Sequence, residues 1–489
     1  MTADYENLDN SIKNLKMYAV DAFAAKATRA IYDQLPLSKL PFFSSSFTRG
    51  KNSYEIYIID PGTDPVTAEI QIDRPKGDVG GGTVHANVDK GNYWTRRGNE
   101  HLVNPFLEHD FVRDFNTVRQ AIEELVAPWR DLPKPSVIEG VYDNDFQNIS
   151  TALAIPGASV GVASPTGESN IYSRLNLVKD ASDAMAGTSW DAFRGKFYEL
   201  LPPAINANNA LAHYLASTIK AEGTLFKEAR SLVAELVEKA SQAFNAAGNN
   251  WSTDIPFDWK IVLDIAVLVA GAAADVVSGG AATSVVAASA VNLGLEVVKT
   301  VVDREERTAK GEANYDNVLD SFKNDMEAIS SHVFETEKEI GNNLNRNCIQ
   351  AIRGSAHYDI KLGEITTGSS EELAIKDRDK VRTIYQTVMP DISNELAGIA
   401  GKTGKLAVPF ANAIARHGKV GIGEFGPLGQ FQNLAYVIAS YLNELSEEAG
   451  LGGKNLEAAV NDIDAQDEDS QRALDSIIND IENYTERND

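Results

Sequence analysis

The stretch Thr188-Ser189-Trp190-Asp191-Ala192-Phe193-Arg194-Gly195-Lys196-Phe197 decides how the fold of this chain is interpreted. A tryptophan stands at the end of one amphipathic run, small residues and phenylalanines follow it, and a long helical pattern then begins. A large aromatic ring at such a bend can fix the angle between two helices by packing. The segment therefore predicts a helix–turn–helix elbow in which Trp190 fills the bend and Phe193 and Phe197 are its neighbours.

Helical periodicity continues on both sides of this elbow. Apolar residues recur at three- and four-residue steps, which is the spacing of one face of a helix. The expected helices cover about residues 4–34, 104–129, 168–185, 190–246, 315–353, 370–388, 391–399, 409–416, 429–449 and 456–484. Pro202 and Pro203 should interrupt the second helix of the elbow near its start. We therefore predict a mainly α fold of long-helix bundles.

A small β insert near the N-terminus is the exception. Residues 53–60 and 66–72 alternate apolar and polar side chains, and Pro61-Gly62-Thr63-Asp64 between them has turn chemistry. This pattern predicts a β-hairpin, with a further strand at 84–88. Residues 147–166, rich in Ser, Gly, Ala and Pro, are expected to be a connection, with one short helix within it as an alternative.

These patterns divide the chain into six regions. We expect an N-terminal helix at 1–40, a β-rich insert at 41–102, a helical domain at 103–250 that contains the elbow hairpin at 168–248, an apolar helical hairpin at 251–310, a second helical domain at 311–445 and an acidic C-terminal helix at 446–489.

Composition limits the classes of partner and the compartment. The 489 residues carry a formal net charge of −25, which argues against nucleic acid as a partner because phosphate binding needs a basic face. Cys348 is the only cysteine, so no intramolecular disulfide is expected. Residues 1–34 mix charged and apolar side chains, which a classical secretory leader does not tolerate. We expect a secreted or surface-associated protein without such a leader, or alternatively a cytoplasmic one.

Short matches to catalytic motifs lack the context that their chemistry needs. Residues 421–426 spell G-x-G-x-x-G, but a helical pattern precedes them where a dinucleotide site needs a strand. The other partial matches are G-x-S-x-G at 157–161, S-x-x-K at 217–220, Gly-Lys-Thr at 401–403 and the pair His101 and His109. We expect a non-enzymatic protein with no catalytic, metal or cofactor site.

Residues 260–302 are unusually apolar and pose two alternatives. No charged residue lies between Asp275 and Glu296, and Gly279-Gly280 divides the segment, so a helical hairpin is expected. Asp264 and Asp275 each oppose insertion by about 2.5–3.5 kcal/mol, and each Leu, Ile or Val favours it by only about 0.3–0.6 kcal/mol. We favour a hairpin of the core, and keep open a membrane insert hidden in the soluble form. The residues that would mark this insert are Ile261, Leu268, Gly279, Gly280, Val286 and Leu293.

Residues 168–248 resemble the WXG family of type VII (ESX) secretion substrates of actinobacteria, including the PE/PPE-like fused proteins. Such modules are a helix, a turn carrying W-x-G and a second helix. Here Trp190-Asp191-Ala192 stands at the motif with Ala192 in place of the glycine, and Phe193, Gly195 and Phe197 look like the continuation. The family's export signal, Y-x-x-x-[DE], is matched only by Tyr5 and Asp9, at the opposite end of the chain.

The resemblance implies export and action through protein–protein interfaces, with the secretion machinery and either a second copy of this chain or another helical protein as partners. Two other functions stay open. The apolar segment predicts a pore-forming or membrane-inserting protein that uses residues 260–302 as its hairpin. The long helices and the β insert also fit a structural subunit of a phage or surface assembly.

Overall fold

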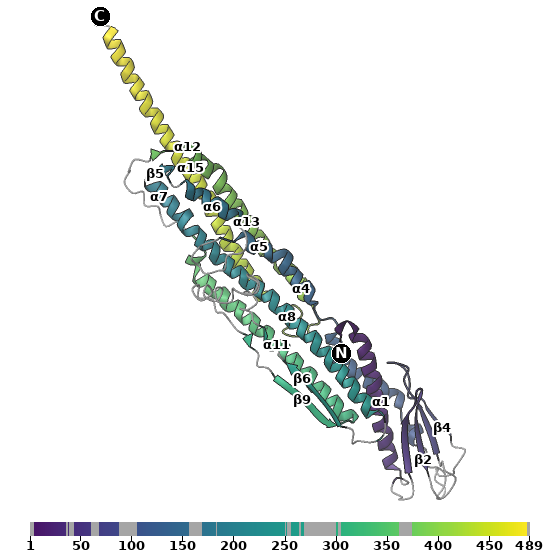
Figure 1. The fold of residues 1–489 in the computed structure, drawn as a ribbon. Coiled ribbons are helices and arrows are strands. Elements are labelled where there is room, and N and C mark those ends of the chain that lie inside the picture. Colours follow the sequence, from purple (N-terminus) through teal and green to yellow (C-terminus); the bar gives the residue numbers. More distant parts are fainter. Residues whose placement is uncertain are drawn as a thin grey trace.

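The longest helical patterns fold as continuous helices that run along an elongated rod (Figure 1). The computed structural model describes residues 4–35, 38, 44–59, 68–87, 105–155, 169–181, 183–249, 251, 256–263, 266–267, 300–301, 305–360 and 374–486. Helices α8 (Leu201–Ala247) and α11 (Tyr315–Arg353) pack against each other and run in opposite directions. The predicted mainly α fold with a small β insert is confirmed.

Further elements complete the rod around these two helices. The remaining helical segments are η1 (Tyr5–Asn7), α1 (Leu8–Gln34), α2 (Pro105–Glu108), α3 (Phe111–Val126), η4 (Ala127–Trp129), α4 (Pro135–Val141), η5 (Tyr142–Phe146), α5 (Gln147–Ala152), α6 (Asn170–Asp180), α7 (Thr188–Arg194), η6 (Gly195–Leu200), η7 (Ser355–His357), α12 (Arg378–Thr383), η8 (Ile384–Val388), α13 (Met389–Lys405), α14 (Ala407–Ile414) and α15 (Leu428–Glu486). α1 and α3 pack together beside the end of α8 that lies next to the sheet, and α13 and α15 pack together toward the other end of the rod.

The insert is a four-stranded antiparallel sheet at one end of the rod. Its strands are β1 (Ser44–Arg49), β2 (Ser53–Ile59), β3 (Ala68–Asp73) and β4 (Val84–Asn87), in the order β1-β2-β3-β4. The pairing of Ile56 with Phe47 on one side and with Ile70 on the other places buried apolar side chains across the middle of the sheet. The hairpin expected from residues 53–72 is thus part of a larger meander. A separate pair of short strands, β5 (Met185–Ala186) and β10 (Ala374–Ile375), joins the start of α7 to the start of α12.

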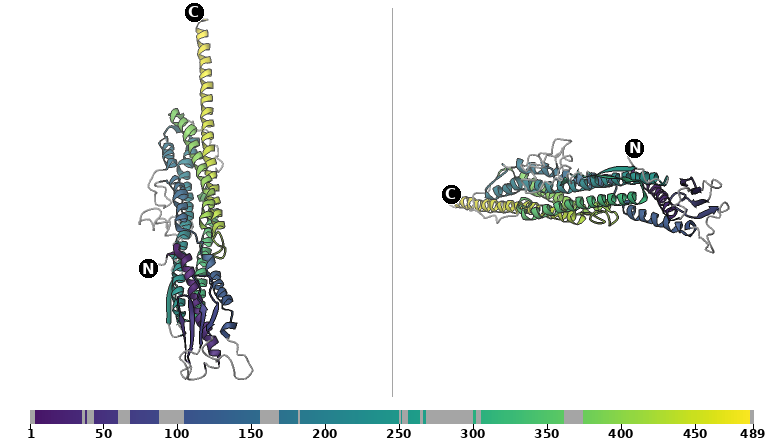
Figure 2. Two further views of the ribbon diagram at one scale, coloured as in Figure 1. Left: turned by 90° about the vertical axis from the view of Figure 1, so that its right-hand side faces the viewer. Right: turned by 90° about the horizontal axis from the view of Figure 1, so that it is seen from below.

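Helix α15 is continuous where the sequence indicated a break. We expected one helix to end at 449 and another to begin at 456, and Gly450, Gly452 and Gly453 lie between these bounds. These glycines instead allow close packing, since a Cβ at Gly452 would lie 2.3 Å from the Phe197 ring and one at Gly453 would lie 3.1 Å from Cβ of Met389. The C-terminal part of α15 extends beyond the rest of the rod in both views of Figure 2.

Two further local predictions differ in detail. Regular α-helix is interrupted near Pro202 and Pro203, but the interruption is the π-helical segment η6, which ends just before them. The prolines occupy the first turn of α8, where a missing N–H costs no hydrogen bond. The connection expected at 147–166, for which one short helix was the alternative, begins as helix α5, and residues 156–166 lie outside the described residues.

Candidate functional site

The described ends of the apolar segment form strands. β6 (Pro256–Leu263) pairs with β9 (Glu305–Glu312) from Pro256–Glu312 to Leu263–Glu305, and β7 (Ala266–Val267) pairs with β8 (Thr300–Val301) farther along. We call these paired strands the β6–β9 ladder. The predicted helical hairpin at 251–310 is therefore wrong at both of its described ends. The alternation of Phe257, Trp259, Ile261 and Leu263 is a strand signal, which the apolar composition of the whole segment obscured.

One face of β6 is packed against the rod. Its burial alternates, with Phe257, Trp259, Ile261 and Leu263 all less than 8% exposed. The side chains of Asp258 and Lys260, which point the other way, are exposed. Both α8 and α11 contact the ladder (Figure 1). Of the residues predicted to mark the membrane insert, Ile261 is thus buried on the face of β6 that packs against the helices. The others, Leu268, Gly279, Gly280, Val286 and Leu293, lie outside the described residues.

The carboxylate of Asp325 on α11 holds both strands of the ladder. Trp259 Nε1 donates to Asp325 Oδ2 at 2.8 Å, and Arg307 Nε donates to Asp325 Oδ1 at 3.2 Å. Asp325 is only 4% exposed, so these contacts replace much of its hydration. Hydrogen bonds to a charged group each contribute about 1.5–3 kcal/mol. Asp325 is therefore the main polar attachment of the ladder to α11 among the contacts that the structure describes.

The ladder is connected to α11 through a short loop and to α8 through a hydrogen bond. β9 ends at Glu312, and α11 begins three residues later. Asn314 caps this helix, because its side chain accepts a hydrogen bond from the N–H of Asn317 at 2.9 Å. At the other strand, Lys239 Nζ of α8 donates to the carbonyl oxygen of Lys260. Movement of the ladder is thus linked directly to α8 and α11, the helices that form the length of the rod.

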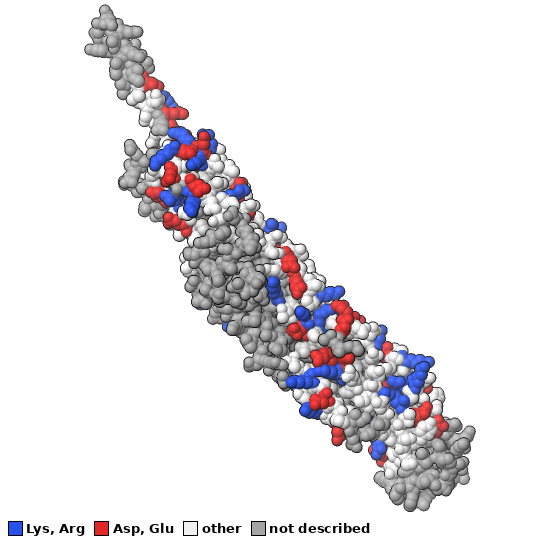
Figure 3. Space-filling model, viewed as in Figure 1, with Lys and Arg blue, Asp and Glu red and all other residues white. Residues whose placement is uncertain are grey.

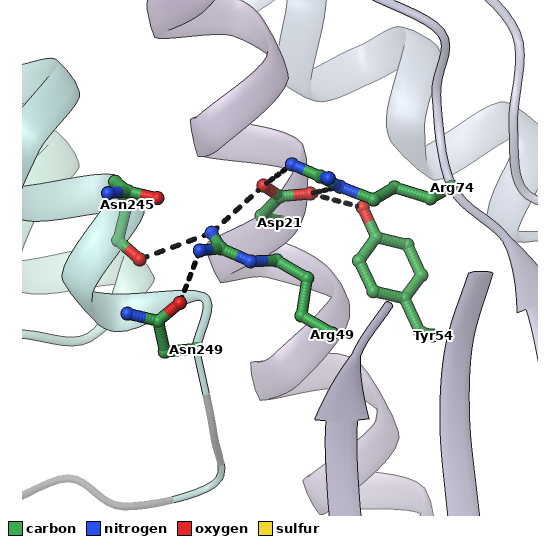
Figure 4. Close-up of polar contacts among 6 residues, drawn as sticks. All are labelled: Asp21, Arg49, Tyr54, Arg74, Asn245 and Asn249. Carbon is green, nitrogen blue, oxygen red and sulfur yellow. Dashed lines mark hydrogen bonds and ion pairs between the residues drawn. The ribbon is translucent and has the colours of Figure 1, made fainter. Parts of the chain in front are cut away.

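A second buried cluster joins the sheet to the helices (Figure 4). The Asp21 carboxylate of α1 is fully buried and accepts hydrogen bonds from Tyr54 at 2.7 Å, from Arg74 at 2.8 and 2.6 Å and from Arg49 at 3.1 Å. Arg49 also donates to the carbonyl oxygen of Asn245 at 3.2 Å, near the end of α8. Burial, followed by the nearby Asp21 carboxylate, raises the pKa of Tyr54 well above its usual value. The cluster is a charge-paired anchor between the sheet, α1 and α8.

The Trp190 elbow consists of α6, the short strand β5 and α7. Trp190 is 1% exposed, and its ring stacks on Phe193 with the centroids 5.4 Å apart and the planes 8° from parallel. Phe193 in turn lies 4.9 Å from the Phe197 ring, which contacts Gly452 of α15. Ala192 is half-buried, and a Cβ at Gly195 would meet nothing within 4 Å. These residues have the geometry of helix packing.

Tyr5 and Asp9, the match to the export signal, are bound into the rod. The Tyr5 hydroxyl donates to the carbonyl oxygen of Trp129 and accepts from the N–H of Leu132 at 3.1 Å. The Arg230 guanidinium lies 3.9 Å from the centre of the Tyr5 ring. Asp9 forms an ion pair with Arg130. The Tyr5 side chain therefore takes part in the packing of the N-terminus, whereas Asp9, whose side chain is 71% exposed, forms a surface ion pair.

The described residues of the remaining sequence motifs make contacts that hold the fold together. Ser217 is buried and donates to the carbonyl oxygen of His213 within its own helix, at 3.0 Å. His109 pairs with Asp114 at 2.8 Å, while His101 and Ser159 lie outside the described residues. Within the part of the chain that is described, no three His, Cys, Asp or Glu side chains are grouped as metal ligands. Likewise, none of its helices combines the length and apolar character that a bilayer span requires.

The charges on the described surface are mixed. In Figure 3, lysine and arginine side chains alternate with acidic ones along the rod. Comparison of the chain with protein-family models, curated proteins and solved structures finds no match. The argument for function therefore rests on the residues of the chain and their geometry.

Proposed function

We propose that this protein inserts into lipid bilayers through the apolar segment at residues 260–302 and permeabilises them. The observation that carries the proposal is the β6–β9 ladder, which holds both described ends of this segment against the side of α8 and α11. Residues 276–295 between those ends hold no charged side chain. A segment of that length and character matches the roughly 20 residues needed to cross the hydrocarbon core.

The way the ladder is held supports its release. α8 contacts α1, α4 and α11 directly, so the helix bundle has packing that does not depend on the ladder. One face of β6 is exposed, and the main polar attachment is the carboxylate of Asp325. Transfer of the buried face of β6 to lipid would therefore exchange one apolar contact surface for another. We infer that the ladder holds the ends of the segment on the rod until the segment inserts into a membrane.

Val286→Asp is expected to abolish dye release from vesicles of phosphatidylcholine and phosphatidylglycerol. A charge at the centre of a membrane segment opposes insertion by about 2.5–3.5 kcal/mol, which corresponds to roughly a hundredfold lower population of the inserted form. Release of an encapsulated dye, measured against protein concentration, checks this expectation.

Val408→Asp is the matched control for this experiment. Val408 lies on α14, is 65% exposed and is remote from the apolar segment in sequence. The control should leave leakage at the wild-type level. Leakage that persists unchanged in Val286→Asp would eliminate residues 260–302 as the inserting segment.

Asp325→Ala is expected to accelerate leakage. The substitution removes the acceptor of Trp259 and Arg307, and each lost hydrogen bond to the charged group is worth about 1.5–3 kcal/mol. We expect an increase of roughly tenfold or more in the initial rate, measured by stopped-flow mixing with the same vesicles. Asp320→Ala, an exposed position on the same helix, is the control. A slower or equal rate in Asp325→Ala would show that the ladder is not held back by this carboxylate.

We propose, second, that the protein leaves the cell by a type VII route, as the WXG-like segment implies. The observation in favour is the burial of Trp190 in a helix–turn–helix, the role that the tryptophan has in the family's modules. Fractionation of a strain with a working type VII system tests it. Recovery of the protein only in the cell pellet would argue against export.

A further inference from the structure

The middle of the rod buries two glutamates that face each other across α8 and α11. Glu222 on α8 and Glu337 on α11 are both fully buried. Each stands on the apolar stripe of its helix, Glu222 between Ile219 and Phe226, and Glu337 between neighbours that are likewise buried. An unpaired charge in such a position costs several kcal/mol, so the partners of the two carboxyl groups decide their ionisation.

Glu337 has the partners of an ionised carboxylate. It forms an ion pair with Arg416, whose side chain is also fully buried, and it accepts a hydrogen bond from the N–H of Ile422 at 2.7 Å. Arg416 further donates to the carbonyl oxygens of Ile414 at 3.1 Å and Val420 at 3.3 Å. The guanidinium lies 4.8 Å from the centre of the Phe226 ring.

The G-x-G-x-x-G sequence at 421–426 serves this ion pair. Gly421 has φ = 64°, and a Cβ there would lie 1.9 Å from Glu337 Oε2. A Cβ at Gly426 would lie 3.1 Å from the Arg416 guanidinium. The glycines therefore let the loop backbone close over two buried charges, which accounts for a motif that has no nucleotide site around it.

Glu222 has no such donors. Neither of its carboxyl oxygens meets an N–H or hydroxyl donor among the described residues, and its polar neighbour is the carboxyl group of Glu337. Two carboxyl groups can hydrogen-bond to each other only when one of them carries a proton. Two ionised glutamates beside one arginine would also leave a net negative charge in the core. Burial of both carboxyl groups and the lack of a described donor at Glu222 therefore favour a pair that holds one proton.

We propose that Glu222 and Glu337 form a proton-dependent lock between α8 and α11, closed while the pair keeps its proton and loosened when alkaline conditions remove it. In the closed state, Glu222 donates its proton to Glu337, and Arg416 neutralises Glu337. Loss of the proton leaves two carboxylates facing each other in the core. Their repulsion acts directly on the contact between α8 and α11.

The charged groups around the pair favour this sequence of events. Burial, and next the negative charge of Glu337, raises the pKa of Glu222 well above its usual value, while Arg416 lowers it. Burial raises the pKa of Glu337 to about 7, against the lowering effects of Arg416 and the Ile422 N–H. From α4, the neighbour of the adjacent Gly223 is the apolar Ile138, and from α15 the neutral Gln430 lies beside Gly341.

The direction of the pH effect follows from these raised values. The folded pair binds protons more tightly than the unfolded chain, in which a glutamate has its ordinary pKa. Its contribution to stability is therefore complete below the unfolded pKa and is lost as the pH rises through the folded values. The lock is independent of membrane insertion, although release of α8 and α11 would also free the β6–β9 ladder that they carry.

Infrared spectroscopy and urea unfolding test the lock. Wild-type protein should show the carbonyl band of a buried protonated carboxylic acid at pH 7, and Glu222→Gln should lack it. The ratio of the unfolding constants, wild type over Glu222→Gln, should increase about tenfold per pH unit between the ordinary pKa of an unfolded glutamate and the raised pKa of the folded pair, and level off once the folded pair has ionised, because one proton is linked to the transition. Glu228→Gln, on the same helix and half-exposed, should keep both the band and the wild-type pH dependence.

Either of two results would overturn the proposal. One is the absence of the protonated-acid band in the wild-type protein between pH 6 and 8, which needs no variant to fold. The other is a Glu222→Gln protein whose unfolding has the same pH dependence as the wild type. Neither depends on leakage, so a failure of the lock and a failure of membrane insertion can be told apart.

Discussion

Replacing Asp21 with alanine is expected to lower the free energy of unfolding by about 3–5 kcal/mol, because it removes one partner of a buried ion cluster. The carboxylate is fully buried and accepts two hydrogen bonds from the Arg74 guanidinium, at 2.8 and 2.6 Å. Without it, Arg49 and Arg74, whose side chains are only 15% and 16% exposed, are two like charges at the junction of the sheet and the helices. Urea unfolding followed by circular dichroism measures the loss.

Asp33→Ala provides the comparison for this variant. Asp33 lies on the same helix and pairs with Arg29 at 3.0 Å, but its side chain is 51% exposed. An exposed pair of this kind contributes roughly 0.3–0.5 kcal/mol. Gly248 also passes close to Asp21, because a Cβ at Gly248 would lie 2.6 Å from that of Asp21, so the backbone around the cluster cannot easily rearrange. Equal effects of the two alanine substitutions would show that the cluster does not anchor the sheet.

Local periodicity predicted the helices that pack through a single apolar stripe. Residues 315–353 were expected as one helix from the stripe of Val318, Phe322 and Met326, and α11 has these bounds. The same reasoning fails where the contact is distant in sequence. Gly452 looks like a helix break until the ring of Phe197 is placed beside it. The strand β6 has a local alternation, but its partner β9 lies more than forty residues away, and no local pattern indicates that the two pair.

The buried charges could be predicted only in part. Glu222 and Glu337 occupy stripe positions, and a charged residue on a stripe is a detectable signal of a buried polar contact. The sequence does not indicate that the two meet each other and Arg416, because three separate elements supply them. Asp21 lies off the apolar stripe of Leu8, Ile12, Leu15 and Ala19 on α1, and side chains of the sheet cover this further face of the helix. No local pattern contains that information.

Replacing Trp190 with alanine is expected to destabilise the protein by about 3–5 kcal/mol, the range for removing a large aromatic side chain from a packed core. Its ring is 1% exposed and stacks on Phe193 at 5.4 Å, and Phe193 leads to Phe197 and the close approach of α15. The cavity would thus open where α7, η6 and α15 meet. The shift in urea midpoint relative to wild type measures the effect.

Trp190→Phe and Phe334→Ala separate packing from recognition. Trp190→Phe keeps an aromatic ring in the site and should lose less stability than the alanine variant, while Phe334→Ala removes a ring that is 41% exposed and should have little effect. A stable Trp190→Phe protein can then be fractionated in the strain that tests the proposed export. If it folds normally and is still exported, the contribution of Trp190 to export is the shape of the elbow. If it folds normally and is retained in the cell, a partner recognises the indole itself. Because Trp190 is 1% exposed, this partner must bind the chain before the elbow folds.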